Sequence, residues 1–169
     1  MALLAEEIVE EWLRRQGYFT MRGIKIGVSE IDLLAIRRLE DGTTECRHLE
    51  VQASVRPVSY ISKVPKAIQK TGKAAGSAAR TESELIEGVA EWVEKKFQAP
   101  KKHALMKTLW DGEWSAELVL NKFKSPQEVD LIRGHGIEII QLDDVLKELR
   151  GDWVFATSGA DLVDLVSLN

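Results

Sequence analysis

Hydrophobic residues recur at helical spacing in several parts of this chain. Between residues 2 and 16, Leu4, Ile8 and Trp12 lie four residues apart, which places them on one face of a helix. Gly17 follows at the point where such a helix is expected to end. The same periodicity predicts further helices over residues 82–97, 126–133 and 143–149.

Other segments follow the pattern of strands. Residues 30–38 are hydrophobic on both faces, as expected of a central strand, whereas residues 45–53 alternate between two faces. Residues 104–110, after a loop expected at 100–102, fit either a strand or a short helix. Weaker patterns predict strands near residues 24–26, 114–123 and 137–142. This order of elements predicts an α/β fold in which a mixed sheet of about five strands is flanked by helices.

Two acidic residues interrupt the two clearest strands. Asp32 lies within Ile31–Ile36, and Glu50 follows in the next predicted strand. A carboxylate in a hydrophobic strand is costly unless a cation or hydrogen-bond donors meet it. Two such carboxylates on successive strands can converge on one hard cation, which we expect to be Mg²⁺, with Mn²⁺ as a substitute. The backbone carbonyl of Val51 lies between the paired side chains and is expected to supply a third oxygen.

Gln52 projects on the same face of this strand as Glu50, because side chains alternate along a strand. A hydrogen-bonding group at this place can orient a water that attacks a phosphodiester. The competing interpretation is that Asp32 and Glu50 are strand carboxylates paired with lysines. The sequence favours the metal site but leaves both interpretations open.

A basic segment begins directly after Glu50 and Gln52. Between Ala53 and Arg80 there are six basic residues and no acidic residue, although the whole chain of 169 residues has a net charge of −4. Pro65 suits the first turn of a helix that would carry several lysines on one face. We expect this segment to contact the phosphates of a nucleic acid, although a solvated helix face is the alternative. The expected contacts are Arg56, Lys63, Lys66, Lys70 and Lys73.

The composition narrows the class of protein. The length fits one domain, with residues 1–150 as the core and residues 151–169 as a C-terminal helical extension. No hydrophobic stretch approaches the roughly 20 residues that a membrane-spanning helix needs. Cys46 is the single cysteine, so an internal disulfide is excluded, and we expect a cytoplasmic protein.

These residues together resemble the PD-(D/E)XK nuclease superfamily, which has the restriction-endonuclease-like fold. The segment 29–35 resembles the strand that carries the family's aspartate, with Ile31 where the motif's name has proline. Glu50-Val51-Gln52 resembles the (D/E)-X-K element, with glutamine in the lysine position. The helix that carries Glu6 resembles the family's first helix, and the likeness covers residues 3–148.

The resemblance implies a role for each matching residue. Asp32 and Glu50 would be metal ligands, Gln52 would take the place of the lysine near the water, and Glu6 would assist the metal or the water. Glutamine cannot supply the positive charge of a lysine. A lysine from the next segment, such as Lys63 or Lys66, is therefore a candidate to reach into the site.

The sequence thus predicts a Mg²⁺-dependent endonuclease with DNA as its partner. The alternative is a catalytically inactive nucleic-acid-binding or scaffold domain of the same fold within a defence or repair complex. By the same resemblance, the protein is expected to act as a homodimer or as a subunit of a larger complex.

Overall fold

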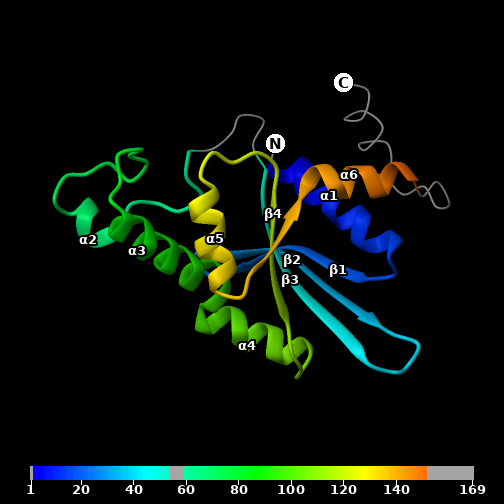
Figure 1. Ribbon diagram of the computed structural model, residues 1–169. Helices are drawn as coiled ribbons and strands as arrows, with labels where there is room; N and C mark the ends of the chain where they lie inside the picture. The colour runs from blue at the N-terminus through cyan, green and yellow to red at the C-terminus, as the bar shows by residue number, and fades with distance from the viewer. Residues whose placement is uncertain (1, 54–58, 152–169) are drawn as a thin grey trace.

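The structure, a computed structural model, describes residues 2–53 and 59–151 and consists of a five-stranded sheet with helices on both faces (Figure 1). The elements in chain order are α1 (Ala2–Arg15), β1 (Phe19–Ile26), β2 (Ser29–Arg38), β3 (Thr44–Gln52), α2 (Lys66–Gln69), α3 (Glu82–Val93), the π-helical turn η1 (Glu94–Gln98), α4 (Pro100–Leu109), β4 (Ser115–Leu120), α5 (Pro126–Gly134), β5 (Glu138–Gln141) and α6 (Leu142–Gly151). The predicted α/β fold with a mixed five-stranded sheet is confirmed.

The sheet is mixed because its two halves are built differently. The strand order is β1-β2-β3-β4-β5. The first three strands form an antiparallel meander, whereas β3, β4 and β5 pair in parallel. Parallel neighbours need crossover connections, which run through α2, α3, η1 and α4 between β3 and β4, and through α5 between β4 and β5. β3 is therefore the strand at which the two halves meet.

Hydrophobic cores fill both faces of the sheet. On one face α1 and α6 pack on Leu33, Leu49 and Val51, and Val145 of α6 closes this core. On the other face α3, η1 and α5 pack on Leu118 and Leu120 of β4 and on β5. β3 is consequently buried on both faces, and any charged side chain on it needs partners inside the protein.

Two predicted elements differ from the structure. A helix follows Pro65 as expected, but the predicted face of lysines is wrong, because α2 ends after four residues at Gln69. Gly72 has a φ of +102°, which favours glycine and is incompatible with helix. The loop expected at residues 100–102 is also wrong, because Pro100 is the first residue of α4, a position that suits proline.

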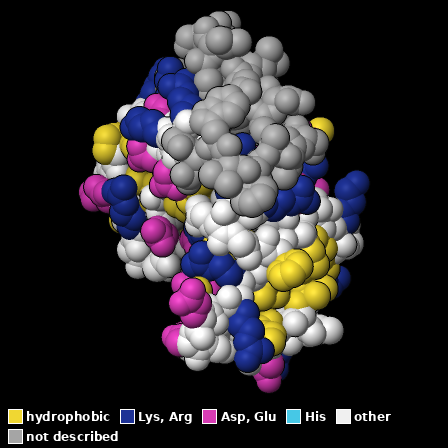
Figure 2. Space-filling model, turned by 90° about the vertical axis from the view of Figure 1, so that its right-hand side faces the viewer, with side chains coloured by type: hydrophobic (Ala, Val, Ile, Leu, Met, Phe, Trp, Pro, Cys, Tyr) yellow, Lys and Arg dark blue, Asp and Glu magenta, His cyan; other side chains and the backbone are white. Residues whose placement is uncertain are grey.

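The side of the molecule that carries α1 and β1 exposes hydrophobic side chains among basic and acidic ones (Figure 2). Phe19, at the start of β1, is 85% exposed. At the opposite end of β1, Val28 in the following turn is fully exposed. β1 is an edge strand of the sheet. No helix among the described residues is long and hydrophobic enough to cross a bilayer. The predicted C-terminal helical extension at 151–169 lies almost entirely outside the described residues.

Candidate functional site

β2 and β3 bring Asp32 and Glu50 together on one face of the sheet. The antiparallel register pairs Leu33 with Leu49 and Leu34 with His48, which sets Asp32 across from Glu50. The Oδ2 atom of Asp32 accepts a hydrogen bond of 2.9 Å from the backbone N–H of Val51. The two acids that the sequence singled out are therefore neighbours, and the backbone of β3 fixes the orientation of Asp32.

Lys96, in η1, joins the two carboxylates. Its Nζ atom lies 2.5 Å from Oε2 of Glu50 and 4.0 Å from Oδ1 of Asp32. A single ammonium group thus stands where the two acids converge. The alternative interpretation from the sequence, an acid paired with lysine, describes Glu50 in this structure.

A second lysine holds Glu50 from inside the protein. The Nζ atom of Lys102, in α4, donates to Oε1 of Glu50 at 2.7 Å and to the backbone carbonyl of Lys96 at 2.7 Å. Lys102 and Glu50 are each 1% exposed. Nε2 of His48 lies 3.2 Å from the same Oε1 atom. We call Asp32, His48, Glu50, Lys96 and Lys102 the Glu50 cluster.

The two carboxyl groups have opposite pKa shifts. Burial opposes the charged form of Glu50, but the hydrogen bond from His48 and the charges of Lys96 and Lys102 outweigh it and lower its pKa to about 2. Burial and the negative charge of Glu50 raise the pKa of Asp32 to about 6, against the opposing charge of Lys96. Glu50 is therefore firmly ionised near neutral pH, whereas Asp32 lacks a partner that offsets its burial.

His48 is neutral in this setting. Burial lowers its pKa despite the neighbouring Glu50. Because an ionised Glu50 can only accept hydrogen bonds, the Nε2 atom of His48 carries the proton and donates it to Glu50. His48 thus helps to fix the glutamate without adding charge.

Glu6 joins this region from α1. Burial raises its pKa, with further raising effects from Glu30 and Glu50 and lowering effects from Arg22 and Lys96. Electrostatic interactions thus reach from Glu6 on α1 to Lys96 and Glu50 of the cluster. Its predicted role toward a metal or a water stays a prediction.

The basic segment has a different arrangement from the one predicted. Arg56 lies outside the described residues, and Lys63, Lys66 and Lys70 are exposed. Lys73 is not free to contact a phosphate, because its Nζ atom lies 2.7 Å from Oε2 of Glu84. The four lysines do not share one helical face, since α2 contains only Lys66 among them.

Gln52 ends β3, and within the described part of the chain its side chain makes no hydrogen bond or ion pair. The lysines that reach Glu50 are Lys96 and Lys102, not Lys63 or Lys66. One signal for Lys96 is present in the sequence, since it follows Val89 and Val93 at helical spacing and so falls on the buried face of α3 and η1. Lys102 could not be assigned to a helix face from the sequence, because residues 100–102 were expected to form a loop.

A cavity of about 290 Å³ borders the cluster at His48 and extends along η1, α4 and the start of β4. Its lining includes Phe97, His103 and Trp114 but none of the carboxylates of the Glu50 cluster. We place the candidate site at the carboxylates rather than in this cavity, because Asp32 and Glu50 both lie within ion-pair distance of Lys96 there.

The donor set of the cluster suits a hard cation with few protein ligands. Among residues 2–53 and 59–151, no three acidic, histidine or cysteine side chains form a metal-binding group. Mg²⁺ is usually held by only one or two carboxylates and keeps several waters. Asp32 and Glu50 provide two carboxylates, and the Oδ1 atom of Asp32 has no hydrogen bond to the described residues.

Comparisons with known proteins bear on the fold alone. No family model matches the chain, and no curated protein matches it significantly. A solved protein of unknown function, AF1548, is similar over 99% of this chain and 78% of its own, with 14% identity and a TM-score of 0.50. The MspJI restriction endonuclease, solved with a 27-mer oligonucleotide, matches over 99% of this chain and 30% of its own, with 16% identity and a TM-score of 0.40. The second likeness is too distant to argue from, so the function has to be argued from the site.

Proposed function

We propose that this chain is a metal-dependent nuclease that hydrolyses DNA phosphodiester bonds at Asp32 and Glu50. The observation that carries the proposal is the convergence of both carboxylates on one ammonium nitrogen, 2.5 Å from Glu50 and 4.0 Å from Asp32. Here an ionised glutamate adjoins an aspartate whose pKa is raised to about 6, which is the pattern of a functional site.

The proposed ion is Mg²⁺, with Mn²⁺ as a substitute. It would be held by Asp32 and Glu50, with the carbonyl of Val51 as a proposed third oxygen. When bound, such an ion polarises a phosphoryl oxygen and lowers the pKa of a bound water. An ion there would also offset the charge that raises the pKa of Asp32.

The chain's own residues prepare this site. Lys102 and His48 keep Glu50 ionised and fixed, and the N–H of Val51 orients Asp32. Lys96 would supply, from η1, the positive charge that Gln52 cannot supply from β3. Gln52 is left to hydrogen-bond the attacking water, and Glu6 would assist from α1.

The proposed substrate contacts lie on the exposed lysines. The side chains of Lys63, Lys66 and Lys70 form no ion pair within the described residues, so their charges are available to phosphates. The segment that carries them touches α3, where the N–H of Lys66 donates to Glu91 at 3.1 Å. Since α3 continues into η1, this contact connects the basic segment to the helix that carries Lys96. We further propose that the chain acts as a homodimer or as a subunit of a larger complex.

The test is a cleavage screen with the full chain and Mg²⁺ or Mn²⁺ over single-stranded, duplex, nicked and branched DNA. We expect metal-dependent cleavage by the wild type and none by Asp32→Ala. Asp130→Ala is the matched control, since Asp130 is an exposed acid paired with Arg133. Cleavage of no substrate by the wild type, or equal cleavage by Asp32→Ala, would refute the proposal.

One observation favours a second candidate function, a non-catalytic DNA-binding or scaffold domain. Both oxygens of Glu50 already contact lysines, and Gln52 carries no charge. Such a domain would bind DNA without cutting it, and Asp32→Ala would leave the binding unchanged. The same screen, with binding measured beside cleavage, separates the two functions.

A further inference from the structure

We infer that the ammonium group of Lys96 occupies the place of the divalent ion, so that the ion and Lys96 compete for Glu50 and loading requires Lys96 to swing away. The inference concerns the regulation of the site and rests on the proposed function. Its basis is that, among the basic groups of the described residues, Lys96 Nζ alone lies within ion-pair distance of both Oε2 of Glu50 and Oδ1 of Asp32.

The two lysines on Glu50 differ in their ability to leave. The side chain of Lys96 is 31% exposed, whereas that of Lys102 is 1% exposed. A buried ammonium group that lost its carboxylate would be left without charge compensation, which is costly. The Lys96 ammonium can instead move into water, so it is the exchangeable partner and Lys102 the permanent one.

The backbone beneath Lys96 is held while its side chain moves. Lys102 donates to the carbonyl of Lys96 at 2.7 Å, and Nε2 of His103 donates to the carbonyl of Phe97 at 3.0 Å. Both carbonyls belong to the π-helical turn η1, an element that is frequent at functional sites. Displacement of Lys96 therefore needs only changes of side-chain torsions, with no change of the fold.

The charges around the site favour the exchange. Asp32 is 4.0 Å from Lys96, too far for a hydrogen bond, so the ammonium satisfies Glu50 and leaves Asp32 poorly compensated. A divalent ion between the two carboxylates compensates both. Glu30 is exposed and interacts electrostatically with Lys96, so a displaced ammonium group meets an acid at the surface.

The first test is amine labelling of the full wild-type chain, followed by mass spectrometry. An acylating reagent should modify Lys96 slowly without metal, and several-fold faster when MgCl₂ is added, because the ion frees its amino group. Lys95 is the internal control: it is the adjacent residue of the same turn, is exposed, and should react at the same rate in both conditions.

The second test is isothermal titration with MnCl₂. Lys96→Met should bind Mn²⁺ about tenfold more tightly than the wild type, the gain expected where Lys96 leaves Glu50 about a tenth of the time. Lys95→Met removes the same charge from the neighbouring position and should leave the affinity unchanged. Lys96→Met should nevertheless fail to cleave DNA, which separates tighter binding from better catalysis.

Asp32-dependent Mn²⁺ binding together with unchanged labelling of Lys96 would overturn the inference and leave the proposed function standing. Absence of Mn²⁺ binding by both the wild type and Lys96→Met would overturn the inference and the proposed function together. Competition between the ion and Lys96 would be established by two results together. Metal should accelerate the labelling of Lys96 but not of Lys95, and Lys96→Met should bind Mn²⁺ more tightly than the wild type.

Discussion

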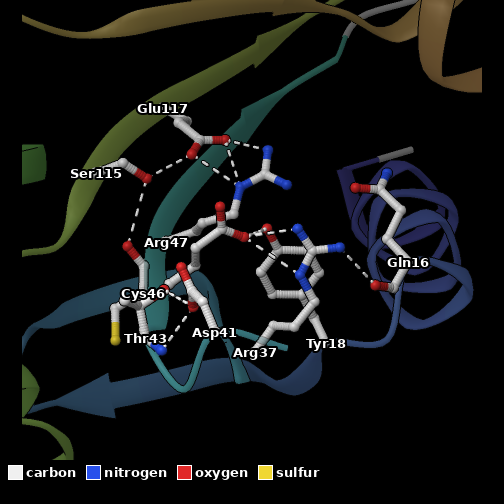
Figure 3. A network of polar contacts seen from close by, with 10 residues as sticks. Gln16, Tyr18, Arg37, Asp41, Thr43, Cys46, Arg47, Ser115 and Glu117 are labelled. Atoms are coloured by element: carbon white, nitrogen blue, oxygen red, sulfur yellow. Dashed lines mark hydrogen bonds and ion pairs between the residues drawn. The ribbon is translucent and has the colours of Figure 1, made fainter. Parts of the chain in front are cut away.

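Two charged clusters lie on opposite faces of β3, and they hold their acids in different ways. In the Glu50 cluster, the ammonium groups of Lys96 and Lys102 form the ion pairs with the acids. On the other face, Arg47 donates hydrogen bonds to the carboxylate of Glu117 (Figure 3). Nε donates to Oε1 at 2.9 Å and to Oε2 at 3.1 Å, and Nη2 donates to Oε2 at 2.5 Å. We call the second group the Arg47 network.

Aromatic rings lie beside Arg47 in this network. The guanidinium of Arg47 lies 5.0 Å from the ring of Trp12 and 5.2 Å from that of Tyr18. Burial alone would lower the pKa of Arg47, but its bonds with Glu117 outweigh this and raise it. Nearby, Tyr18 and Arg37 both donate to Oε2 of Glu45 at 2.7 Å (Figure 3).

The difference shows how an ion pair can be structural or exchangeable. A guanidinium is planar and binds a carboxylate through two parallel bonds, and aromatic rings can cover its faces. An ammonium on a flexible stem is a point charge that a metal ion can replace. The Arg47 network leaves no carboxylate undercompensated, whereas the Glu50 cluster leaves Asp32 with a pKa raised to about 6.

The largest expected effect comes from breaking the Arg47 network. Glu117→Gln leaves the largely enclosed Arg47, whose side chain is 15% exposed, without its charge partner and should cost about 3–5 kcal/mol of unfolding free energy. Denaturant unfolding at neutral pH measures this loss. Asp144→Asn, which removes an exposed acid paired with Lys147, is the control and should change stability little. Equal stabilities of the two variants would remove the contrast on which the comparison depends.

A change of opposite sign is expected at Asp32. Because its folded pKa of about 6 lies above the unfolded value, the ionised side chain destabilises the fold. Asp32→Asn should therefore be more stable than the wild type by about 3 kcal/mol above pH ~7. This difference should shrink as the pH falls through ~6 and vanish below ~4, where Asp32 is protonated in both states.

Unfolding curves from about pH 3 to about pH 8 without metal measure this dependence. Asp41→Asn is a control of opposite sign, because hydrogen bonds from Thr43 lower the pKa of Asp41, and removing that carboxylate should lose stability at neutral pH. A wild type as stable as Asp32→Asn at pH 8 would mean that Asp32 is compensated by another group.

The smallest effect is expected when Lys96 of the Glu50 cluster is replaced by arginine, the basic residue of the Arg47 network. Lys96→Arg should hold Glu50 through a planar fork and weaken Mn²⁺ binding by about tenfold, or about 1.4 kcal/mol. Isothermal titration measures this change, with Lys95→Arg as the control at the adjacent exposed position. Tighter Mn²⁺ binding by Lys96→Arg would contradict competition between the ion and this side chain.

The fold and the two acids could be predicted from the sequence because both depend on local patterns. Strand periodicity located β2 and β3, and Asp32 and Glu50 stood out because charge is costly in such strands. The contact from the Val51 N–H to Asp32 could not be foreseen, since it depends on how the two strands twist against each other. The predicted carbonyl contact of Val51 with an ion stays a prediction.

Helical spacing in the sequence puts Lys96 on a buried face, but it does not show that Lys96 or Lys102 pairs with Glu50. Lys96 lies 46 positions after Glu50 in the chain, and only the packing of η1 on the sheet brings them together. The basic segment between Ala53 and Arg80 lies closer to Glu50 in the sequence and contains no acidic residue. It was therefore the expected source of a lysine for the site. Lys73 of this segment instead pairs with Glu84 of α3. A prediction made from the charges of the segment alone does not include this acid.

The central claim is that Asp32 and Glu50 together bind a divalent ion, and crystals soaked in MnCl₂ test it most directly. An anomalous difference map should show one manganese peak between the two carboxylates, with the side chain of Lys96 moved away from Glu50. A map without a peak there, in which Lys96 still contacts Glu50 at millimolar Mn²⁺, would contradict the account.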